Sequence, residues 1–314
     1  MKKLVFRSTL AFFVVTLVGM LGSSSATAGS YVFQNSGCQA GGALSQPWQF
    51  QITPANAHLR TWDRCDQFPY LIGHWAESVD SGFIYSGDLA SISLDVGNGA
   101  RFTQVNSLTY WLESRGGIEA HVRVEGGSSG SYPIATVANN DNDIGTVTNL
   151  SFPAGAQGPR ISARLICTYG TCVFSGMPMS AIQTSPPTRL TIEDYTAPVA
   201  THLGGSLFSG GSVSGNRTVE PVAFDGNSGV RLVYGYVNGT IAYINASSCN
   251  SFLGDVNKLR PCPNPYSPGS VNLNTAQAPF HEGSNTINVC ALDFATSGSP
   301  NVYCGDQRSV LVDN

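Results

Sequence analysis

Residues 230–239 read Val-Arg-Leu-Val-Tyr-Gly-Tyr-Val-Asn-Gly, and this stretch decides the fold class. Its apolar residues recur at every second position from Val230 to Tyr236, and a period of two predicts a half-buried β-strand. Asn238-Gly239 then predicts a two-residue hairpin turn, because both residues tolerate a positive φ. Residues 286–291 alternate in the same way and predict another strand. We therefore expect antiparallel β-sheet in this part of the chain.

The same alternation recurs upstream, between turns rich in Gly, Pro and Asn, and no long helical periodicity interrupts it. The strands predicted there are Trp48–Ile52, Leu89–Val96, Leu108–Glu113, Ile118–Glu125, Ile161–Thr168 and Arg189–Glu193. Tyr195-Thr196-Ala197-Pro198 then predicts a linker, since proline cannot donate to a strand ladder and favours an extended backbone. The chain is thus expected to be all-β, with one domain over residues 29–195 and a second over 196–314.

The first 28 residues have the composition of a cleavable export signal. Lys2, Lys3 and Arg7 precede the apolar run Leu10–Leu21, and Ala26-Thr27-Ala28 supplies small residues for cleavage before Gly29. The apolar run is too short for an ordinary membrane span, and no second one follows. We therefore expect a secreted, extracellular protein with no membrane span after removal of the signal.

The charge of the mature chain argues against two classes of partner. Of 16 Lys and Arg residues, three lie in the signal, which leaves 13 against 20 Asp and Glu, a net charge of −7. Lys258 is the one lysine of the mature chain. An acidic chain without basic clusters is not expected to bind nucleic acid or anionic lipid.

The second half of the chain resembles a known family in a series of short motifs. These are Asp194-Tyr195-Thr196-Ala197-Pro198, Leu203-Gly204-Gly205-Ser206-Leu207, Phe224-Asp225, Gly229-Val230-Arg231, Asn238-Gly239, Cys249, Pro261-Cys262, His281-Glu282-Gly283, Ala291-Leu292-Asp293 and Val312-Asp313-Asn314. They are similar to the bacterial Ig-like domain of uncharacterised secreted proteins of actinobacteria. The resemblance covers residues 199–314, and the first domain loosely resembles the jelly-roll-type module that precedes it. It implies an N-terminal jelly-roll-like β-sandwich followed by an Ig-like β-sandwich, and it carries no known activity.

Eight cysteines follow the signal, and an even number in an exported chain indicates four disulfides. Four fall in each predicted domain, which leaves three pairings per domain. We favour pairs between cysteines close in sequence, namely Cys38–Cys65, Cys167–Cys172, Cys249–Cys262 and Cys290–Cys304. Zinc is not expected, because the chain has no Cys-x-x-Cys pair and no histidine at ligand spacing.

The chemistry-bearing residues of the first domain gather on one predicted hairpin. In Ile118–Glu125 every second residue is polar, and Leu108–Glu113 alternates as well. Matching their apolar faces leaves residues 115–117 as the loop. This register places Glu113 opposite Glu119, Trp111 opposite His121, and Thr109 opposite Arg123.

Three interpretations of that hairpin stay open. The leading one is a recognition or adhesive protein that binds carbohydrate, or another cell-surface component, through Trp111, His121 and Arg123. The second is a glycoside hydrolase, because retaining enzymes hold two carboxyl groups about 5 Å apart and Glu113 with Glu119 would meet that spacing. The third is a solvated outer face of a purely structural protein. We expect a protein that is not an enzyme.

Calcium is the one cofactor that the sequence raises. Asn139-Asn140-Asp141-Asn142-Asp143 is rich in oxygen ligands, with Asp141 and Asp143 as the candidate metal ligands, but it lacks the EF-hand spacing and suits an ordinary turn. Asp225 and Asp293 lie just beyond apolar strands. They either ligate calcium or, as we favour, hydrogen-bond the backbone of turns.

Overall fold

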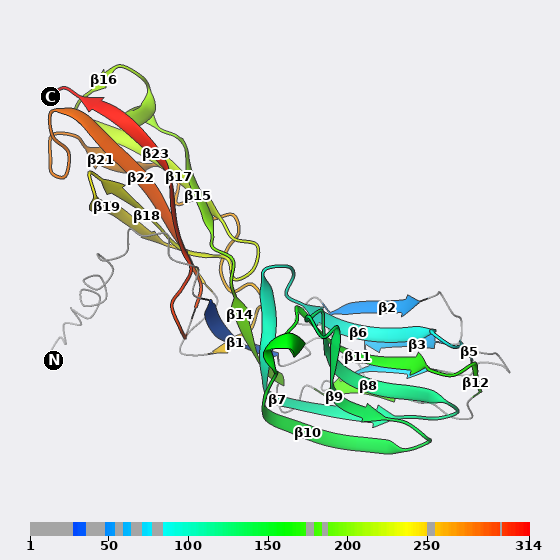
Figure 1. Cartoon of the computed structure of the whole chain (residues 1–314). Coiled ribbons are helices and arrows are strands. Elements are labelled where there is room, and N and C mark those ends of the chain that lie inside the picture. Colours follow the sequence, from blue (N-terminus) through cyan, green and yellow to red (C-terminus); the bar gives the residue numbers. More distant parts are fainter. Residues whose placement is uncertain are drawn as a thin grey trace, which may run out of the picture.

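The structure, a computed structural model, describes residues 28–35, 48–53, 59–63, 71–76, 84–173, 179–183, 188–249, 255–295 and 297–314. Within them the chain is all-β, as predicted, and forms a jelly-roll-like sandwich followed by an Ig-like sandwich (Figure 1). The only helical elements there are the 3₁₀ turns η1 (Ala154–Ala156) and η2 (Ser206–Phe208). None of the helical structure in the described ranges is long and apolar enough to span a membrane. The predicted export signal, apart from Ala28, lies outside the described residues.

The first layer of the N-terminal sandwich, here called the β7 sheet, has eight strands. Their order is β20-β1-β14-β7-β13-β4-β3, and β10 also pairs with β7. The strands are β1 (Gly29–Asn35), β3 (Leu59–Asp63), β4 (Leu71–Ala76), β7 (Ala100–Glu113), β10 (Asn142–Ser151), β13 (Met179–Gln183), β14 (Thr188–Asp194) and β20 (Asp255–Val256).

The second layer, here called the β8 sheet, has five strands in the order β2-β6-β11-β8-β9. They are β2 (Gln49–Thr53), β6 (Leu89–Asp95), β8 (Ile118–Glu125), β9 (Ser131–Val137) and β11 (Arg160–Cys167). A two-residue pairing of β5 (Ile84–Tyr85) with β12 (Thr171–Cys172) closes one end of the sandwich.

Apolar side chains of both sheets fill the space between them. Leu108 and Leu112 of β7 belong to the same buried cluster as Val122 of β8 and Leu165 of β11, and all four are fully buried. Because alternate residues of a strand point to opposite faces, the polar residues of β8 and β11 lie on the outer face of the β8 sheet.

The predicted pairing of 108–113 with 118–125 is wrong. Strand β7 pairs with β10, β13 and β14, whereas β8 pairs with β9 and β11, so the two strands lie in different sheets. The turn itself forms, with Ile118 N donating to Arg115 O over 3.0 Å and positive φ at Gly116 and Gly117. The strands then diverge, each with its apolar face toward the shared core.

The C-terminal sandwich consists of a three-stranded and a five-stranded sheet. The first, the β17 sheet, has the order β15-β17-β21, from β15 (Val199–Gly204), β17 (Asn216–Phe224) and β21 (Val271–Asn274). The second, the β22 sheet, has the order β16-β23-β22-β18-β19. Its strands are β16 (Ser212–Val213), β18 (Val230–Val237), β19 (Thr240–Ala246), β22 (Gly283–Asp293) and β23 (Val302–Val312).

The stretch 230–239 forms the predicted strand and turn. Strand β18 ends at Val237, and Asn238 and Gly239 follow with φ of 51° and 80° before β19. Both faces of β18 are apolar. Val233 and Val237 point into the core between the sheets, while Tyr234 packs with Cys290 in a separate small cluster.

Three disulfides lie within the described residues, and they are three of the four pairs favoured from the sequence. They are Cys167–Cys172, Cys249–Cys262 and Cys290–Cys304. The remaining predicted pair, Cys38–Cys65, lies outside the described residues. Since disulfides persist in oxidising compartments, these bonds indicate a place outside the cytoplasm.

The two sandwiches meet at β1 and β14, and the C-terminal one extends away from that end (Figure 1). Strand β20, which lies between β19 and β21 in sequence, pairs in parallel with β1 of the β7 sheet. The Tyr31 hydroxyl donates to Leu259 O over 2.7 Å, and its ring packs edge-on against Phe294 at 5.8 Å. Val256 and Phe294 are therefore part of the same buried cluster as the N-terminal core.

Candidate functional site

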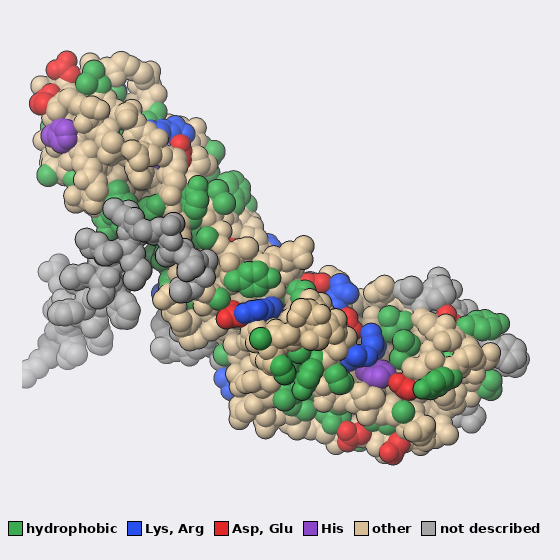
Figure 2. All heavy atoms as spheres, in the orientation of Figure 1, with side chains coloured by type: hydrophobic (Ala, Val, Ile, Leu, Met, Phe, Trp, Pro, Cys, Tyr) green, Lys and Arg blue, Asp and Glu red, His purple; other side chains and the backbone are tan. Residues whose placement is uncertain are grey.

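The outer face of the β8 sheet carries a group of charged side chains on two adjacent strands. On β8 the outward residues are Glu119, His121, Arg123 and Glu125, and on the neighbouring β11 they are Arg160, Ser162 and Arg164. Figure 2 shows basic, acidic and histidine side chains gathered in one row across the face of this sandwich that it displays. We call this set the β8 face.

His121 has both ring nitrogens engaged. Its Nε2 lies 3.2 Å from Oε2 of Glu119, and its Nδ1 lies 3.1 Å from Oγ1 of Thr136 on β9. Burial, and next the charges of Arg164 and Arg123, lower the pKa of His121 to about 4, although Glu119 opposes the shift. At neutral pH the ring is therefore uncharged, which fits Nε2 as donor to Glu119 and Nδ1 as acceptor.

Arg123 and Arg164 lie next to each other on the β8 face. Arg164 is opposite His121 in the register and Ser162 is opposite Arg123, so the two arginines are diagonal neighbours. Burial first, and then the charge of Arg123, lower the pKa of Arg164, while Glu125 opposes this. Two positive charges thus lie at diagonal positions on adjacent strands.

The two arginines differ in their partners. Arg164 Nη1 donates to Glu125 Oε1 over 3.2 Å, while its Nε is buried and has no partner. The Nε of Arg123 is likewise buried without a partner, and within the described part of the chain the Arg123 side chain forms no hydrogen bond or ion pair. Arg123 is therefore a partly buried cation with unused donors.

The carboxylates of the β8 face are already hydrogen-bonded. Glu119 Oε1 accepts from Oγ1 of Thr168 over 3.1 Å, in addition to its contact with His121. Glu125 Oε1 accepts from Ser162 Oγ over 2.8 Å and from Arg164. Neither acid forms an ion pair with Arg123, so the guanidinium of Arg123 keeps its donors for a ligand.

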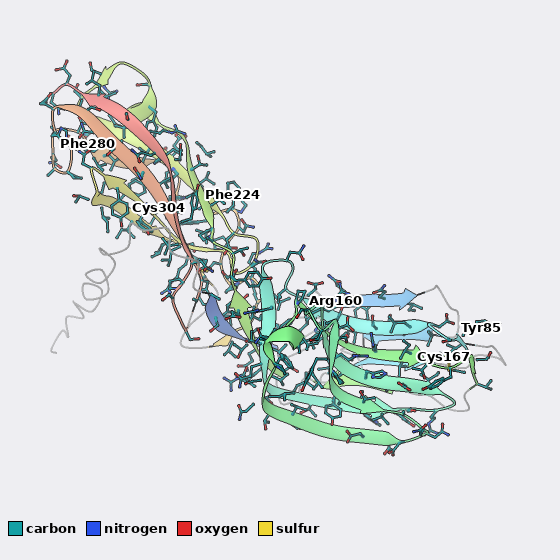
Figure 3. All side chains as sticks on the ribbon, viewed as in Figure 1. Tyr85, Arg160, Cys167, Phe224, Phe280 and Cys304 are labelled. Atoms are coloured by element: carbon teal, nitrogen blue, oxygen red, sulfur yellow. A yellow bond between two sulfur atoms is a disulfide. The ribbon has the colours of Figure 1, made fainter. Side chains whose placement is uncertain are left out.

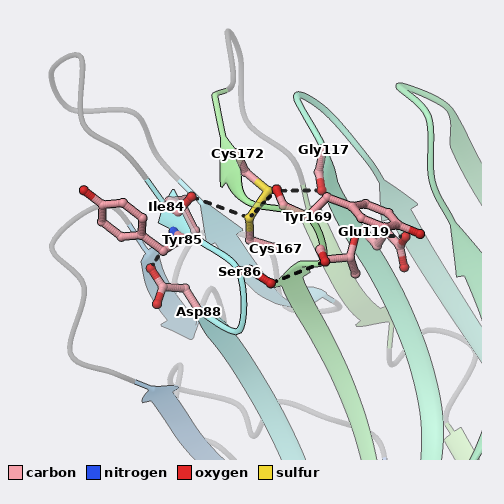
Figure 4. The surroundings of a disulfide bond; sticks show 10 residues. Ile84, Tyr85, Ser86, Asp88, Gly117, Glu119, Cys167, Tyr169 and Cys172 are labelled. Carbon is pink, nitrogen blue, oxygen red and sulfur yellow. Dashed lines mark hydrogen bonds between the residues drawn. A yellow bond between two sulfur atoms is a disulfide. The ribbon is translucent and has the colours of Figure 1, made fainter.

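The end of the face far from the junction is built around the Cys167–Cys172 disulfide (Figures 3 and 4). Between the two cysteines, the turn holds Tyr169, whose side chain is 79% exposed. Figure 4 shows the Tyr169 side chain extending on the Glu119 side of the disulfide and that of Tyr85 extending on the opposite side. Thr168 fixes this turn to β8 through its hydrogen bond to Glu119.

Of the predicted site residues, the structure brings together His121 and Arg123 but not Trp111. Trp111 lies on β7, opposite Ile144 of β10 and Ala181 of β13, and so belongs to the other sheet. The predicted Trp111–His121 contact is wrong, because it depended on a hairpin that does not form.

The same correction removes the carboxylate pair of the glycoside-hydrolase hypothesis. Glu113 ends β7 and forms an ion pair with Arg115, whereas Glu119 lies on β8 and is engaged by His121 and Thr168. Strands β7 and β8 do not pair, so Glu113 and Glu119 are not held opposite each other as the glycosidase hypothesis requires.

The Asp141 and Asp143 loop is used as a turn. Asn139 and Asn140 have φ of 63° and 58°, a conformation that asparagine adopts readily. Asp141 Oδ1 accepts from the backbone of Asn142, and Asp143 Oδ2 accepts from the Tyr110 hydroxyl over 2.7 Å. Among the described residues, these two acids are not part of a cluster close enough to share an ion.

Arg164 and Tyr169 are the site residues that sequence reasoning missed. Arg160, Ser162 and Arg164 alternate with Ile161, Ala163 and Leu165, so the pattern alone would have placed the arginines on an outer face. The pattern could not predict that this strand, β11, pairs with β8.

No known protein-family profile and no curated protein match this sequence. Among solved structures, the chain is similar to the glycoside hydrolase domain of Endo-D from Streptococcus pneumoniae R6, at 10% identity and a TM-score of 0.25. It is also similar to a GH2 beta-galacturonidase from Eisenbergiella tayi, at 11% identity and a TM-score of 0.21. These matches cover 90% and 93% of this chain but only 43% and 45% of those chains. Likeness at these scores carries no argument about ligand or activity.

Proposed function

We propose that the protein is a secreted recognition protein whose β8 face binds an acidic saccharide. The observation that carries the proposal is Arg123, a partly buried guanidinium without a partner in the described part of the chain, beside the second cation Arg164. A buried polar group without a partner costs free energy, so a site that keeps one favours a ligand that supplies the partner.

The chemistry of the face favours a carboxylate or sulfate on the ligand. A guanidinium donates two parallel hydrogen bonds to such a group, which gives orientation as well as affinity. His121 is neutral and its hydrogen bonds are used within the protein, so its role is to position Glu119 rather than to touch the ligand.

The length of the face favours an oligosaccharide over a single sugar. Glu119, which contacts the Tyr169 turn through Thr168, is four residues from Arg123 on β8, or about 13 Å along a strand. Tyr169 supplies an exposed aromatic ring for stacking on a sugar at one end, and Arg123 supplies the charge at the other.

A glycan array with neutral, uronic-acid and sulfated oligosaccharides tests this proposal. We expect wild type to bind acidic members, Arg123→Ala to lose that signal, and Arg160→Ala to keep it. Arg160 is a matched control because it lies on the adjacent strand and is held by Asp95 at 2.9 Å. Absence of binding by wild type to every acidic glycan would contradict the proposal and favour a purely structural protein.

A further inference from the structure

Three buried aspartates meet where the two sandwiches join. Asp194 ends β14 of the N-terminal sandwich, Asp225 follows β17, and Asp293 ends β22. Their exposed fractions are 0%, 4% and 0%, and one carboxylate oxygen from each lies within 4.8 Å of the others. Residues of both sandwiches thus contribute to one acidic cluster, here called the junction cluster.

A fourth oxygen at the junction cluster has no partner. Asn301 is 2% exposed, and its Nδ2 donates to Asp293 Oδ2 over 2.7 Å and to the backbone oxygen of Asp194 over 2.9 Å. These two acceptors fix which end of the amide is nitrogen. Its Oδ1, bonded to the same carbon and therefore beside those contacts, is buried and accepts no hydrogen bond.

The hydrogen bonds of the three carboxylates leave acceptor capacity. Asp225 accepts from Asn227 N and Ser228 Oγ, each over 3.0 Å, and Asp293 accepts from the backbone and side-chain nitrogens of Asn301, each over 2.7 Å. Asp194 Oδ1 is fully used by Thr196 and Asn227, whereas its Oδ2 accepts only from Ser228 N, over 3.0 Å. A carboxylate has about four lone-pair sites, so Asp225, Asp293 and Asp194 Oδ2 can still coordinate an ion.

The negative charge of the junction cluster is not neutralised by an ion pair with the basic side chains that the structure describes. Arg260, the nearby base, donates to Gly226 O instead. Three carboxylates this close repel one another when ionised, so the cluster favours a cation between them.

We propose that Asp194, Asp225, Asp293 and Asn301 form a calcium site that joins the two sandwiches. Calcium takes six to eight oxygen ligands at about 2.3–2.6 Å, so two of its ligands can be as far apart as about 5 Å. Oxygens within 4.8 Å of one another fit that span, and calcium accepts irregular sets of carboxylate and amide oxygens, whereas magnesium demands near-octahedral geometry and usually keeps several waters. Water molecules complete the coordination number.

The site would stiffen the junction, because Asp194 ends the last strand of one sandwich, whereas Asp293 ends a strand of the other and Asp225 and Asn301 lie in its loops. The backbone near the cluster already links them, since Ser228 N donates to the Asp194 carboxylate and Asn301 donates to the Asp194 carbonyl. An ion coordinated by all three carboxylates adds bonds that break if the sandwiches separate.

Calorimetric titration of the chelator-treated full mature chain with calcium chloride tests the site, together with thermal unfolding in calcium, magnesium or chelator. We expect one calcium ion per chain with a dissociation constant of about 10⁻³ M or tighter, as in extracellular modules. Calcium should raise the unfolding midpoint more than magnesium does. Asp225→Asn and Asp293→Asn should each weaken binding at least tenfold.

Asp141→Asn/Asp143→Asn is the control, since those acids lie in an exposed turn away from the cluster. Each junction variant removes one of three repelling charges, so the chain without calcium should stay folded. If a variant nonetheless fails to fold, the wild-type comparison of calcium with chelator decides. No heat and no midpoint shift with millimolar calcium would overturn the proposal, as would loss of binding in the Asp141→Asn/Asp143→Asn control.

Discussion

His121 and Arg123 lie two residues apart on the same face of β8, yet their surroundings give them different roles. Both ring nitrogens of His121 have partners inside the protein, whereas the guanidinium of Arg123 has none among the described residues. A satisfied buried histidine stabilises the fold, and a cation with unused donors favours a ligand. The first therefore predicts an effect on stability and the second an effect on binding.

We expect the pH dependence of stability to report His121. Its pKa is about 4 in the folded chain and 6.5 when unfolded, so the unfolded chain takes up a proton first as the pH falls. The stabilisation is fully present above pH 6.5 and is lost progressively toward pH 4, by up to about 3 kcal/mol. Urea unfolding of wild type and His121→Gln across this range measures it.

Other charged groups face the same ring, so the comparison with the variant is needed. Glu119 and Arg123 lie on the same strand and Arg164 lies on β11, and all three act on the pKa of His121. His121→Gln should flatten the stability profile between pH 6.5 and 4. An equally steep profile in the variant would show that another group causes the loss.

Alanine substitutions at two glycines distinguish the cost of backbone strain from the cost of a steric clash. Gly229 and Gly239 have φ of 79° and 80°, so alanine at either position costs about 1–2 kcal/mol of strain. A Cβ at Gly229 would lie 2.2 Å from the backbone oxygen of Cys262, whereas a Cβ at Gly239 meets nothing within 4 Å. Gly229→Ala should lose at least twice the unfolding free energy that Gly239→Ala loses. Equal losses in urea titrations would contradict the packing described here.

At the scale of strands, alternation predicted position well. Strand β8 has the predicted bounds Ile118–Glu125, and β6, β11, β14 and β18 each lie within one residue of prediction at both ends. In these segments a buried face repeats every second residue, so local pattern and tertiary burial agree. Strand β7 was predicted only from Leu108, because its first half, from Ala100, alternates less regularly.

Which strands pair with each other could not be predicted in the same way. Two consecutive strands whose apolar faces match can pair in one sheet or face each other from two sheets, and both arrangements bury the same residues. The pattern of 108–125 therefore could not distinguish a hairpin from the crossing between sheets that the structure shows. In the structure His121 and Arg123 therefore share strand β8, as predicted, whereas Trp111 and Glu113 lie on β7 in the other sheet.

At the scale of the whole molecule, the two sandwiches share a core. Tyr31 and Phe33 of β1 belong to one buried cluster with Val256, Cys262 and Phe294 from the second half of the chain. Sequence patterns within each half do not report contacts of this kind, because they join residues more than 200 positions apart. Unfolding of one sandwich should expose surface of the other.

We therefore expect a single cooperative unfolding transition in scanning calorimetry. Phe294→Ala should cost about 3–5 kcal/mol and separate the transition into two, because the ring belongs to the N-terminal cluster and contacts Tyr31. Phe280→Ala is the control, since Phe280 packs only within the C-terminal core (Figure 3). Two transitions in the wild type, or the same separation in both variants, would contradict a shared core.

The proposed recognition function depends on this architecture, which presents the β8 face on a sandwich fixed to its neighbour. The most direct test is calorimetric titration of wild type, Arg123→Lys and Arg123→Ala with an oligouronide. We predict binding by wild type, weaker binding by the lysine variant, which keeps the charge but loses the two-pronged hydrogen bond, and at least tenfold loss in the alanine variant. Equal affinity in all three proteins, or no binding by wild type, would contradict the account.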